Sequence, residues 1–373
     1  METYRLNSKL VENDREFLIQ TANDISRKTV SSEIYVNGHM AEEVRFPHPE
    51  NIGADEILSL VKSTHSETKR DVESLLKAYR AVMASGNTAA MHQVANAFYY
   101  RRFLGEARDV LIAVIEIDDQ QHQAYNLLAM SEHALGNAEC AVEAARVAVS
   151  LKPEYADYRN NMGLALIATR EYDAAVTEFE KATSINMYYS DAYFNCGLAL
   201  LLNAIDQRNT NLFANVLSRS LDYFNKAALI YPQFKTSDFD RGMAHLNAHE
   251  LEQACELFTR VRDTKTEQHR RKHASYVMKA ALSPHWLSEQ AVEERIVFLM
   301  REIEHHPTYS DYQSELGQCY LERAHLTWKK AIEQYAKTLE QNPALQKVSD
   351  NLDLAERVHE QMREVIETIV RKG

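Results

Sequence analysis

The chain has 373 residues, of which only 10 are glycine and 7 are proline, and 42 Lys and Arg against 54 Asp and Glu give a formal net charge of −12. So few turn-forming residues argue against β-sandwiches, barrels and collagen-like chains. The excess of acid argues against nucleic acid as a partner, because affinity for phosphate backbones comes largely from clustered Lys and Arg. The composition, with 45% hydrophobic residues, is that of an ordinary folded soluble protein.

The segment before residue 88 has its own pattern. We expect a helix near Asp14–Ser26, followed by two strand-like runs, Thr29–Tyr35 and Met40–Phe46. These runs flank an Asn-Gly pair, which is the strongest short-range signal for a β-hairpin. Apolar residues at helical spacing then predict a long helix over Ala54–Ala84. The sequence therefore predicts a small α+β segment that contains a β-hairpin.

From residue 88 the chain repeats at intervals of 34 residues, with units that begin at Thr88, His122, Ala156 and Ser190. In the unit that starts at Ala156, a small residue, Gly163, is followed by Ala175, Phe179 and Ala182. This spacing resembles the tetratricopeptide repeat (TPR) family, in which each unit is a pair of helices. Small residues let the two helices approach, and large residues fill the space between neighbouring pairs. One pair cannot bury its apolar face alone, so the pairs must stack.

Later units depart from the strict period. About 11 extra residues lengthen the fourth pair, near residues 204–217. A further pair starts near Lys235, a degenerate pair spans His269–Pro307 with an interruption at Ser283–Pro284, and the pattern returns over Ser310–Leu345. The apolar periodicity of Gln346–Arg371 then predicts a terminal helix.

These patterns predict an all-α fold: a TPR-type helical-pair solenoid, wound as a right-handed superhelix, with the small α+β segment at its N-terminal end. The expected organisation is a cap or appendage at residues 1–87, an array of about seven helical pairs at 88–345 and a C-terminal capping helix at 346–373.

The resemblance implies that the inner positions of each first helix line a concave groove that binds a peptide. Carried over to this sequence, those positions are His92, Gln93, Asn96, Tyr99, Asn126, Met130, His133, Asn160, Asn161, Leu164, Phe194, Asn195, Leu198, Phe239, Asp240 and Met243. Asn161 and Asn195 resemble the amides with which family members hold a peptide backbone, since an amide both donates and accepts hydrogen bonds. The alternative is that these amides bond neighbouring helices to each other, and the sequence leaves both open.

A related subfamily clamps a terminal carboxylate with cations along this face. Arg159 beside Asn160 and Asn161 looks similar, but Phe194 and Asp191 stand where further cations would be needed. The face is better described as amide, aromatic and methionine, which suits a segment of mixed polarity.

Metal, cofactor and catalytic sites are not expected. His245 with His249, and His269 with His273, each place two imidazoles on one helical face, but no third ligand is evident. The sequence has no nucleophile motif and no glycine-rich phosphate loop. We therefore expect a protein that is not an enzyme.

The functional prediction is a non-catalytic scaffold that binds a peptide or a partner helix in the concave groove. The alternatives are a homo-oligomer that assembles through the hairpin or the C-terminal helix, and an accessory or regulatory subunit of a larger complex. Four widely spaced cysteines fit a reducing compartment. With no signal-peptide core, and no stretch near the roughly 20 uncharged residues of a bilayer span, we expect a cytoplasmic protein without membrane insertion.

Overall fold

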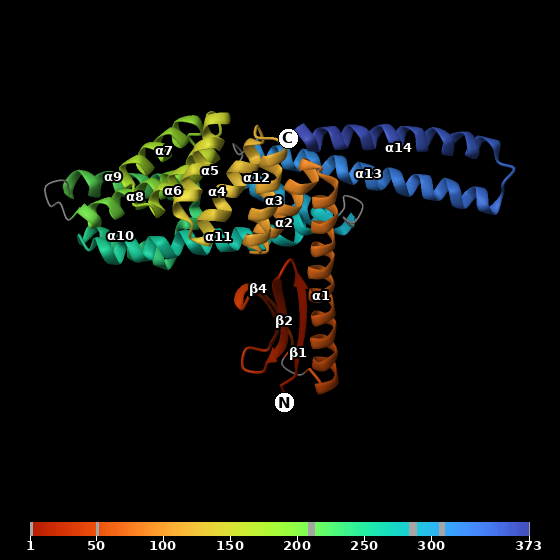
Figure 1. The fold of residues 1–373 in the computed structure, drawn as a ribbon, viewed down its shortest axis with the longest axis horizontal. Coiled ribbons are helices and arrows are strands. Elements are labelled where there is room, and N and C mark those ends of the chain that lie inside the picture. The colour runs from red at the N-terminus through yellow and green to blue at the C-terminus, as the bar shows by residue number, and fades with distance from the viewer. Residues whose placement is uncertain (1–2, 50–51, 208–212, 283–288, 306–309, 373) are drawn as a thin grey trace. The chain divides into compact units, whose positions relative to one another are not determined.

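The computed structural model describes residues 3–49, 52–207, 213–282, 289–305 and 310–372 (Figure 1). The chain divides into two compact units, Met1–Leu282 and Ser283–Gly373. The first unit holds a β-sheet and most of the helical pairs, and the second holds three helices.

The first unit begins with a four-stranded antiparallel meander. The strands β1 (Arg5–Glu12), β2 (Arg15–Asp24), β3 (Thr29–Val36) and β4 (His39–Pro47) pair in sequence order. The predicted hairpin is confirmed as β3 and β4, joined through Asn37 and Gly38 at φ 48° and 81°. Both residues tolerate positive φ, which a tight hairpin turn requires.

The helix expected near Asp14–Ser26 is wrong, because that segment is β2. Its side chains alternate in burial, and Phe17, Ile19 and Thr21 all lie on the buried face. Alternation with a period of two fits a strand and not a helix. Asn13 and Asp14, at φ 46° and 59°, form the turn between β1 and β2, so the chain carries a second hairpin.

The long helix predicted over Ala54–Ala84 is confirmed as α1 (Ala54–Ser85). It crosses one face of the sheet, where Ile57 and Val61 pack with Val30. Farther along α1, Val72 and Leu75 join the core that also holds Phe17 and Ile34. His65 bridges helix and sheet, with hydrogen-bonding contacts of 2.8 Å to Ser8 Oγ and 3.0 Å to Thr21 Oγ1.

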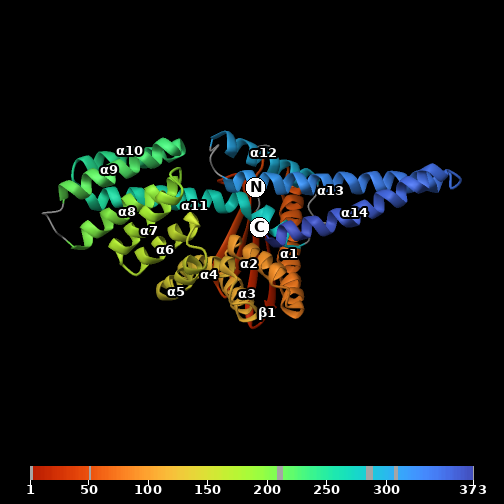
Figure 2. The same ribbon diagram turned by 90° about the horizontal axis from the view of Figure 1, so that it is seen from above.

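Five antiparallel helical pairs follow in the described part of the first unit (Figures 1 and 2). They are α2 (Thr88–Tyr100) with α3 (Leu104–Ile117), α4 (His122–Leu135) with α5 (Ala138–Leu151), α6 (Ala156–Ala168) with α7 (Tyr172–Ile185), α8 (Ser190–Gln207) with α9 (Phe213–Ile230), and α10 (Ser237–Asn247) with α11 (Leu251–Leu282). A short 3-10 helix, η2 (Pro232–Phe234), precedes α10. The helical-pair solenoid with an N-terminal α+β segment is thus the observed fold class.

The close approach of paired helices explains the repeated glycine. A Cβ atom placed on Gly163 of α6 would lie 2.5 Å from Phe179 Cε1 of α7, and Phe179 is fully buried. A Cβ atom placed on Gly242 of α10 would likewise lie 2.9 Å from Phe258 Cε1 of α11. Because real Cβ atoms do not come this close to a ring, the helices can pack at this distance only when the residue has no side chain.

The described residues depart from the predicted pairs at two places: a predicted helix start lies inside α11, and one predicted pair is a single helix. α11 runs without a break from Leu251 to Leu282, so the predicted helix that begins at His269 is its second half. The expected interruption at Ser283–Pro284 lies outside the described residues. Ser310–Leu345, which was expected to be a pair, is instead one helix over most of its length, since α13 (Ser310–Gln341) spans 32 residues. Between residues 251 and 282 the sequence has neither Gly nor Pro, so nothing local ends the helix.

The second unit consists of α12 (Glu289–His305), α13 and α14 (Gln346–Lys372). Arg295 of α12 forms an ion pair with Glu315 of α13. On α14, Ala355 accepts a hydrogen bond of 2.9 Å from Trp328 Nε1, and His359 stacks on His325. α13 and α14 are therefore an antiparallel hairpin. In the described ranges, no helix of either unit has the length and apolar character needed to cross a membrane.

Candidate functional site

The predicted groove residues divide by exposure. Those that remain partly or largely exposed are His92, Gln93, Asn96, Tyr99, Asn126, Met130, His133, Asn161, Leu164, Asp240 and Met243. Those that are buried are Asn160, Phe194, Asn195, Leu198 and Phe239. The accessible part of the predicted groove therefore lies mainly on α2, α4 and α6.

Three of the predicted groove residues lie in the core and are not accessible to a ligand: Phe194, Leu198 and Phe239. The Phe194 ring stacks on Phe234 with centroids 4.5 Å apart and meets Phe224 edge-on at 5.1 Å. All of these rings belong to one buried cluster between α8, α9, η2 and the pair α10–α11. The groove role carried over from the family is corrected here, because the lengthened fourth pair and η2 fill this space with aromatic side chains.

The asparagines form a row of amides between the first helices. Asn161 Nδ2 of α6 donates to Asn126 Oδ1 of α4, and Asn195 Nδ2 of α8 donates to Asn160 Oδ1 of α6, each at 2.9 Å. In this structure the amides hold neighbouring helices together. Asn126 and Asn161 remain partly exposed, so that end of the row is also accessible.

The predicted groove side is not empty, because the second half of α11 packs against two of the first helices, α8 and α2. The helix packs against α10, then against α8, and ends against α2 and α1 (Figures 1 and 2). The second helices α3, α5 and α7 have 14 residues each and α9 has 18, whereas α11 has 32. Sequence reasoning missed this segment, although the absence of a helix breaker after Leu251 was a signal.

The first contact of this segment is made by Lys265. Its ammonium group pairs with Asp191 at the start of α8 and lies 4.4 Å from the ring centroid of Tyr231 and 4.6 Å from that of Phe234. A carboxylate together with two aromatic faces is a favourable environment for a cation.

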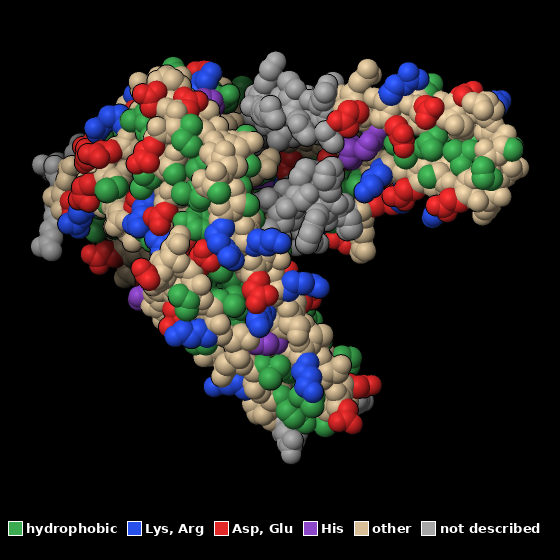
Figure 3. Space-filling view, turned by 45° about the vertical axis from the view of Figure 1, so that its right-hand side comes forward, with side chains coloured by type: hydrophobic (Ala, Val, Ile, Leu, Met, Phe, Trp, Pro, Cys, Tyr) green, Lys and Arg blue, Asp and Glu red, His purple; other side chains and the backbone are tan. Residues whose placement is uncertain are grey.

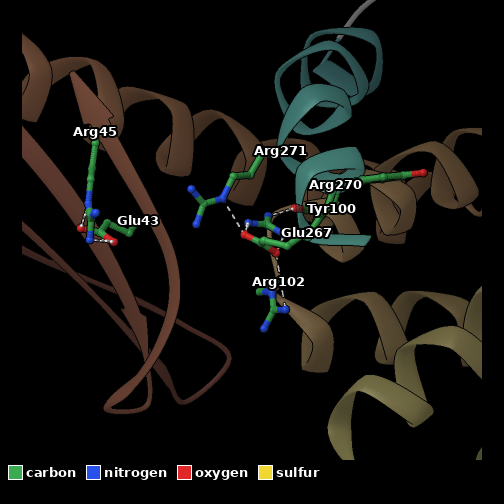
Figure 4. A network of polar contacts seen from close by, with 7 residues as sticks. All are labelled: Glu43, Arg45, Tyr100, Arg102, Glu267, Arg270 and Arg271. Carbon is green, nitrogen blue, oxygen red and sulfur yellow. Dashed lines mark hydrogen bonds and ion pairs between the residues drawn. The ribbon is translucent and has the colours of Figure 1, made fainter. Parts of the chain in front are cut away.

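The second contact joins α11 to the end of α2 (Figure 4). Arg270 Nη1 donates to the carbonyl oxygen of Tyr100, the last residue of α2. Glu267 accepts from Arg270 Nε at 2.8 Å and from Arg271 Nε at 2.6 Å, and it lies 3.7 Å from Arg102 Nη2. The hydrogen bond from Arg270 is the main reason that the pKa of Glu267 falls to about 2.

The third contact connects α11, α2 and the sheet. Arg101, which directly follows α2, forms a buried ion pair with Glu42 of β4, and its Nη1 also contacts the sulfur of Met278 on α11. His273 lies beside the ring of Tyr100, with centroids 5.9 Å apart. His273 and Met278 are 6% and 5% exposed, so the far end of α11 is well packed.

The histidines of this face favour their neutral forms. Burial lowers the pKa of His92 on α2. Partial desolvation, followed by the charge of Arg262 on α11, lowers the pKa of His133 on α4. At neutral pH these side chains therefore contribute dipoles and not charges, while Asp191 provides negative charge at the α8 end.

Neither a metal nor a cofactor site emerges. Within the described ranges, no group of three or more His, Cys, Asp or Glu side chains is placed to hold a metal ion. On the face visible in Figure 3, acidic and basic side chains lie interspersed over the helical pairs, and no patch of one sign dominates.

Residues 156–186 match the family model of the tetratricopeptide repeat. No curated protein sequence matches the chain. Among solved structures, a crystal structure of MamA is 22% identical, covering 42% of this chain and 85% of that chain, with a TM-score of 0.36. YrrB, described as a TPR protein with an unusual peptide-binding site, is 17% identical, with 53% and 96% covered and a TM-score of 0.36. TTC0263, a thermophilic TPR protein in Thermus thermophilus, is 13% identical, with 62% and 97% covered and a TM-score of 0.33.

The match falls on α6 and α7, where Gly163 and Phe179 make the close contact between helices. Residues 156–186 thus form a tetratricopeptide repeat, and the helical pairs on either side of it continue the same helical-pair architecture.

Proposed function

We propose that the protein is a non-catalytic scaffold that binds a segment of a partner protein on the concave face of α2, α4 and α6. The observation that carries this proposal is that the same side of the array already accommodates a helix, the second half of α11. A surface that holds one helix through ion pairs, aromatic faces and a backbone carbonyl has the chemistry to hold another.

The accessible side chains support this assignment. Met130 and Leu164 provide adaptable apolar surface, while Asn126 and Asn161 provide donors and acceptors beside them. The partner is a protein or a peptide, and an accessory subunit of a larger complex would use the same surface.

A library of displayed random peptides, selected on the full chain, tests the proposal. Selected peptides should lose about tenfold or more in affinity for a Met130→Glu variant, because a charge would replace a central apolar contact. The matched control is Leu229→Glu on α9, a side chain that is 78% exposed and lies on a second helix. Equal binding by both variants, or a selection that yields no ligand, would contradict the proposal.

Self-assembly is a second candidate, favoured by the open edge of the sheet. β1 is an edge strand of eight residues whose side chains alternate in exposure, and such an edge can pair with another strand. The other edge strand is β4, which belongs to the predicted hairpin. Its pairing with β3 is irregular at Ile34/Tyr35, and its Glu42 forms an ion pair with Arg101. β1 is therefore the better candidate. Light scattering should show a dimer of the wild-type chain, and the substitution Asn7→Pro should abolish that dimer. A wild-type chain that stays monomeric at high concentration would exclude self-assembly.

A further inference from the structure

α11 has two parts with different surroundings. The first part, Leu251–Val261, packs on α10 as a regular second helix and buries Ala254 and Phe258 completely. The second part, Arg262–Leu282, extends beyond the pair and makes three contacts: with α8, with the end of α2, and with Arg101, which itself pairs with Glu42 of the sheet.

The middle of the second part is held loosely. From Arg262 to Arg271 every side chain is at least partly exposed, whereas His273 and Ala274 are buried. Ion pairs in such positions contribute little stability, and segments with few buried apolar contacts open more readily than a core. Residues 262–271 should therefore open more readily than Leu251–Val261, and displacement of the whole second part must also break the packing of His273, Ala274 and Met278 at its far end.

The contacts specify the chemistry of the occupant. Lys265 places a cation at Asp191, between the faces of Tyr231 and Phe234. Arg270 places a second cation at the carbonyl of Tyr100. The last carbonyls of a helix lack intrahelical partners and carry partial negative charge, which suits a cation.

We propose that residues 262–282 are an internal ligand of the concave face, and that the external partner is a basic α-helical segment that takes their place. Its cations would occupy the Asp191 position and the carboxyl end of α2. This inference rests on the proposed function, since it assigns the same face to both occupants. It adds that the face is covered until the internal segment is displaced.

A labelled peptide with the sequence of residues 262–282 is a direct probe. It competes with the tethered segment, whose effective concentration is high, so the wild-type full chain should bind it weakly. The double variant Lys265→Ala and Arg270→Ala weakens the tethered segment and leaves the face intact. We expect this variant to bind the peptide about tenfold or more tightly than the wild type.

The matched control carries Thr264→Ala and Gln268→Ala. Both side chains are exposed on the same stretch of α11, so this variant should bind the peptide as weakly as the wild type. Adding Asp191→Ala to the first double variant should abolish the gain, because it removes the carboxylate that receives the cation. Equal affinity of all variants, or a gain that survives Asp191→Ala, would overturn the inference.

Hydrogen exchange of the full chain gives an independent test. Amides of 262–282 should exchange faster than those of 251–261, although both belong to one helix. Uniform protection along α11 would overturn the inference. In that case, displayed peptides that bind the wild type and lose affinity for Met130→Glu would still support the proposed function, so the two failures are distinguishable.

Discussion

Gly163→Ala tests the close packing of a helical pair. The new Cβ would lie 2.5 Å from Cε1 and 2.7 Å from Cζ of Phe179, a ring with no exposed surface into which it could turn. Alanine in a helix interior gains about 1 kcal/mol over glycine, whereas overpacking of a filled core costs about 1–3 kcal/mol. The contact is closer than real Cβ contacts, so the cost falls at the upper end. We expect a net loss of about 1–2 kcal/mol in the free energy of unfolding.

Two other glycines, Gly197 of α8 and Gly317 of α13, serve as controls because each lies in a helix interior with different surroundings. At Gly197 the new Cβ would lie 3.0 Å from Phe224 Cζ, so gain and cost should roughly cancel. At Gly317, in the interior of α13, no heavy atom of the described chain lies within 4 Å. Gly317→Ala should therefore stabilise the second unit by about 1 kcal/mol.

The assay is hydrogen exchange at increasing urea concentration, read separately on peptides from α6–α7, α8–α9 and α13. Reading each segment by itself avoids the assumption that two compact units unfold together. The expected order of stability change is a loss for Gly163→Ala, little change for Gly197→Ala and a gain for Gly317→Ala. If Gly163→Ala is neutral or stabilising, the steric account of this helical pair is refuted.

Three further predictions concern burial and charge. Phe194→Ala should lower the free energy of unfolding by about 3–5 kcal/mol, measured by urea denaturation, whereas a purely ligand-binding side chain would leave the midpoint unchanged. Burial raises the pKa of Cys196 to about 12, so at pH 8 iodoacetamide should label exposed Cys140 and spare Cys196, as mass spectrometry can verify. The depressed pKa of Glu267 stabilises the folded state above about pH 4.5, the ordinary value for Glu, and this contribution disappears as the pH falls towards 2. Amides of 262–271 should lose protection over that range, after correction for intrinsic rates, and Glu267→Gln should remove the pH dependence.

Several elements could be predicted because their signals are local. The hairpin at Asn37–Gly38 depends on two residues that tolerate positive φ, and the pairs α2 to α9 depend on small and large residues within one unit. The same reasoning failed at β2, where the alternation of Phe17, Ile19 and Thr21 was present but was interpreted as helical. Strand formation there depends on β1 and β3, and partner strands are not part of a local pattern.

The candidate site remains a prediction. The repeat register predicts Asn126, Met130 and Leu164 for the groove, and all three side chains are partly exposed. It could not show that Phe194 is buried, because that depends on Phe234, which lies forty residues later and stacks on it. Nor could it show that α11 lies along the face, since the Lys265–Asp191 and Arg270–Tyr100 contacts join residues 74 and 170 positions apart.

The sequence by itself determined the unit of this protein: a helical pair, repeated, with glycine where two helices touch and almost no residue to interrupt a helix elsewhere. Only the tertiary structure decided where the long helices end and what they contact. The physical reason is the distance along the sequence between the residues that interact. Helix formation and pair packing depend on neighbours within one repeat, whereas the position of α11 depends on ion pairs and a buried end formed by residues from α8, α2 and β4.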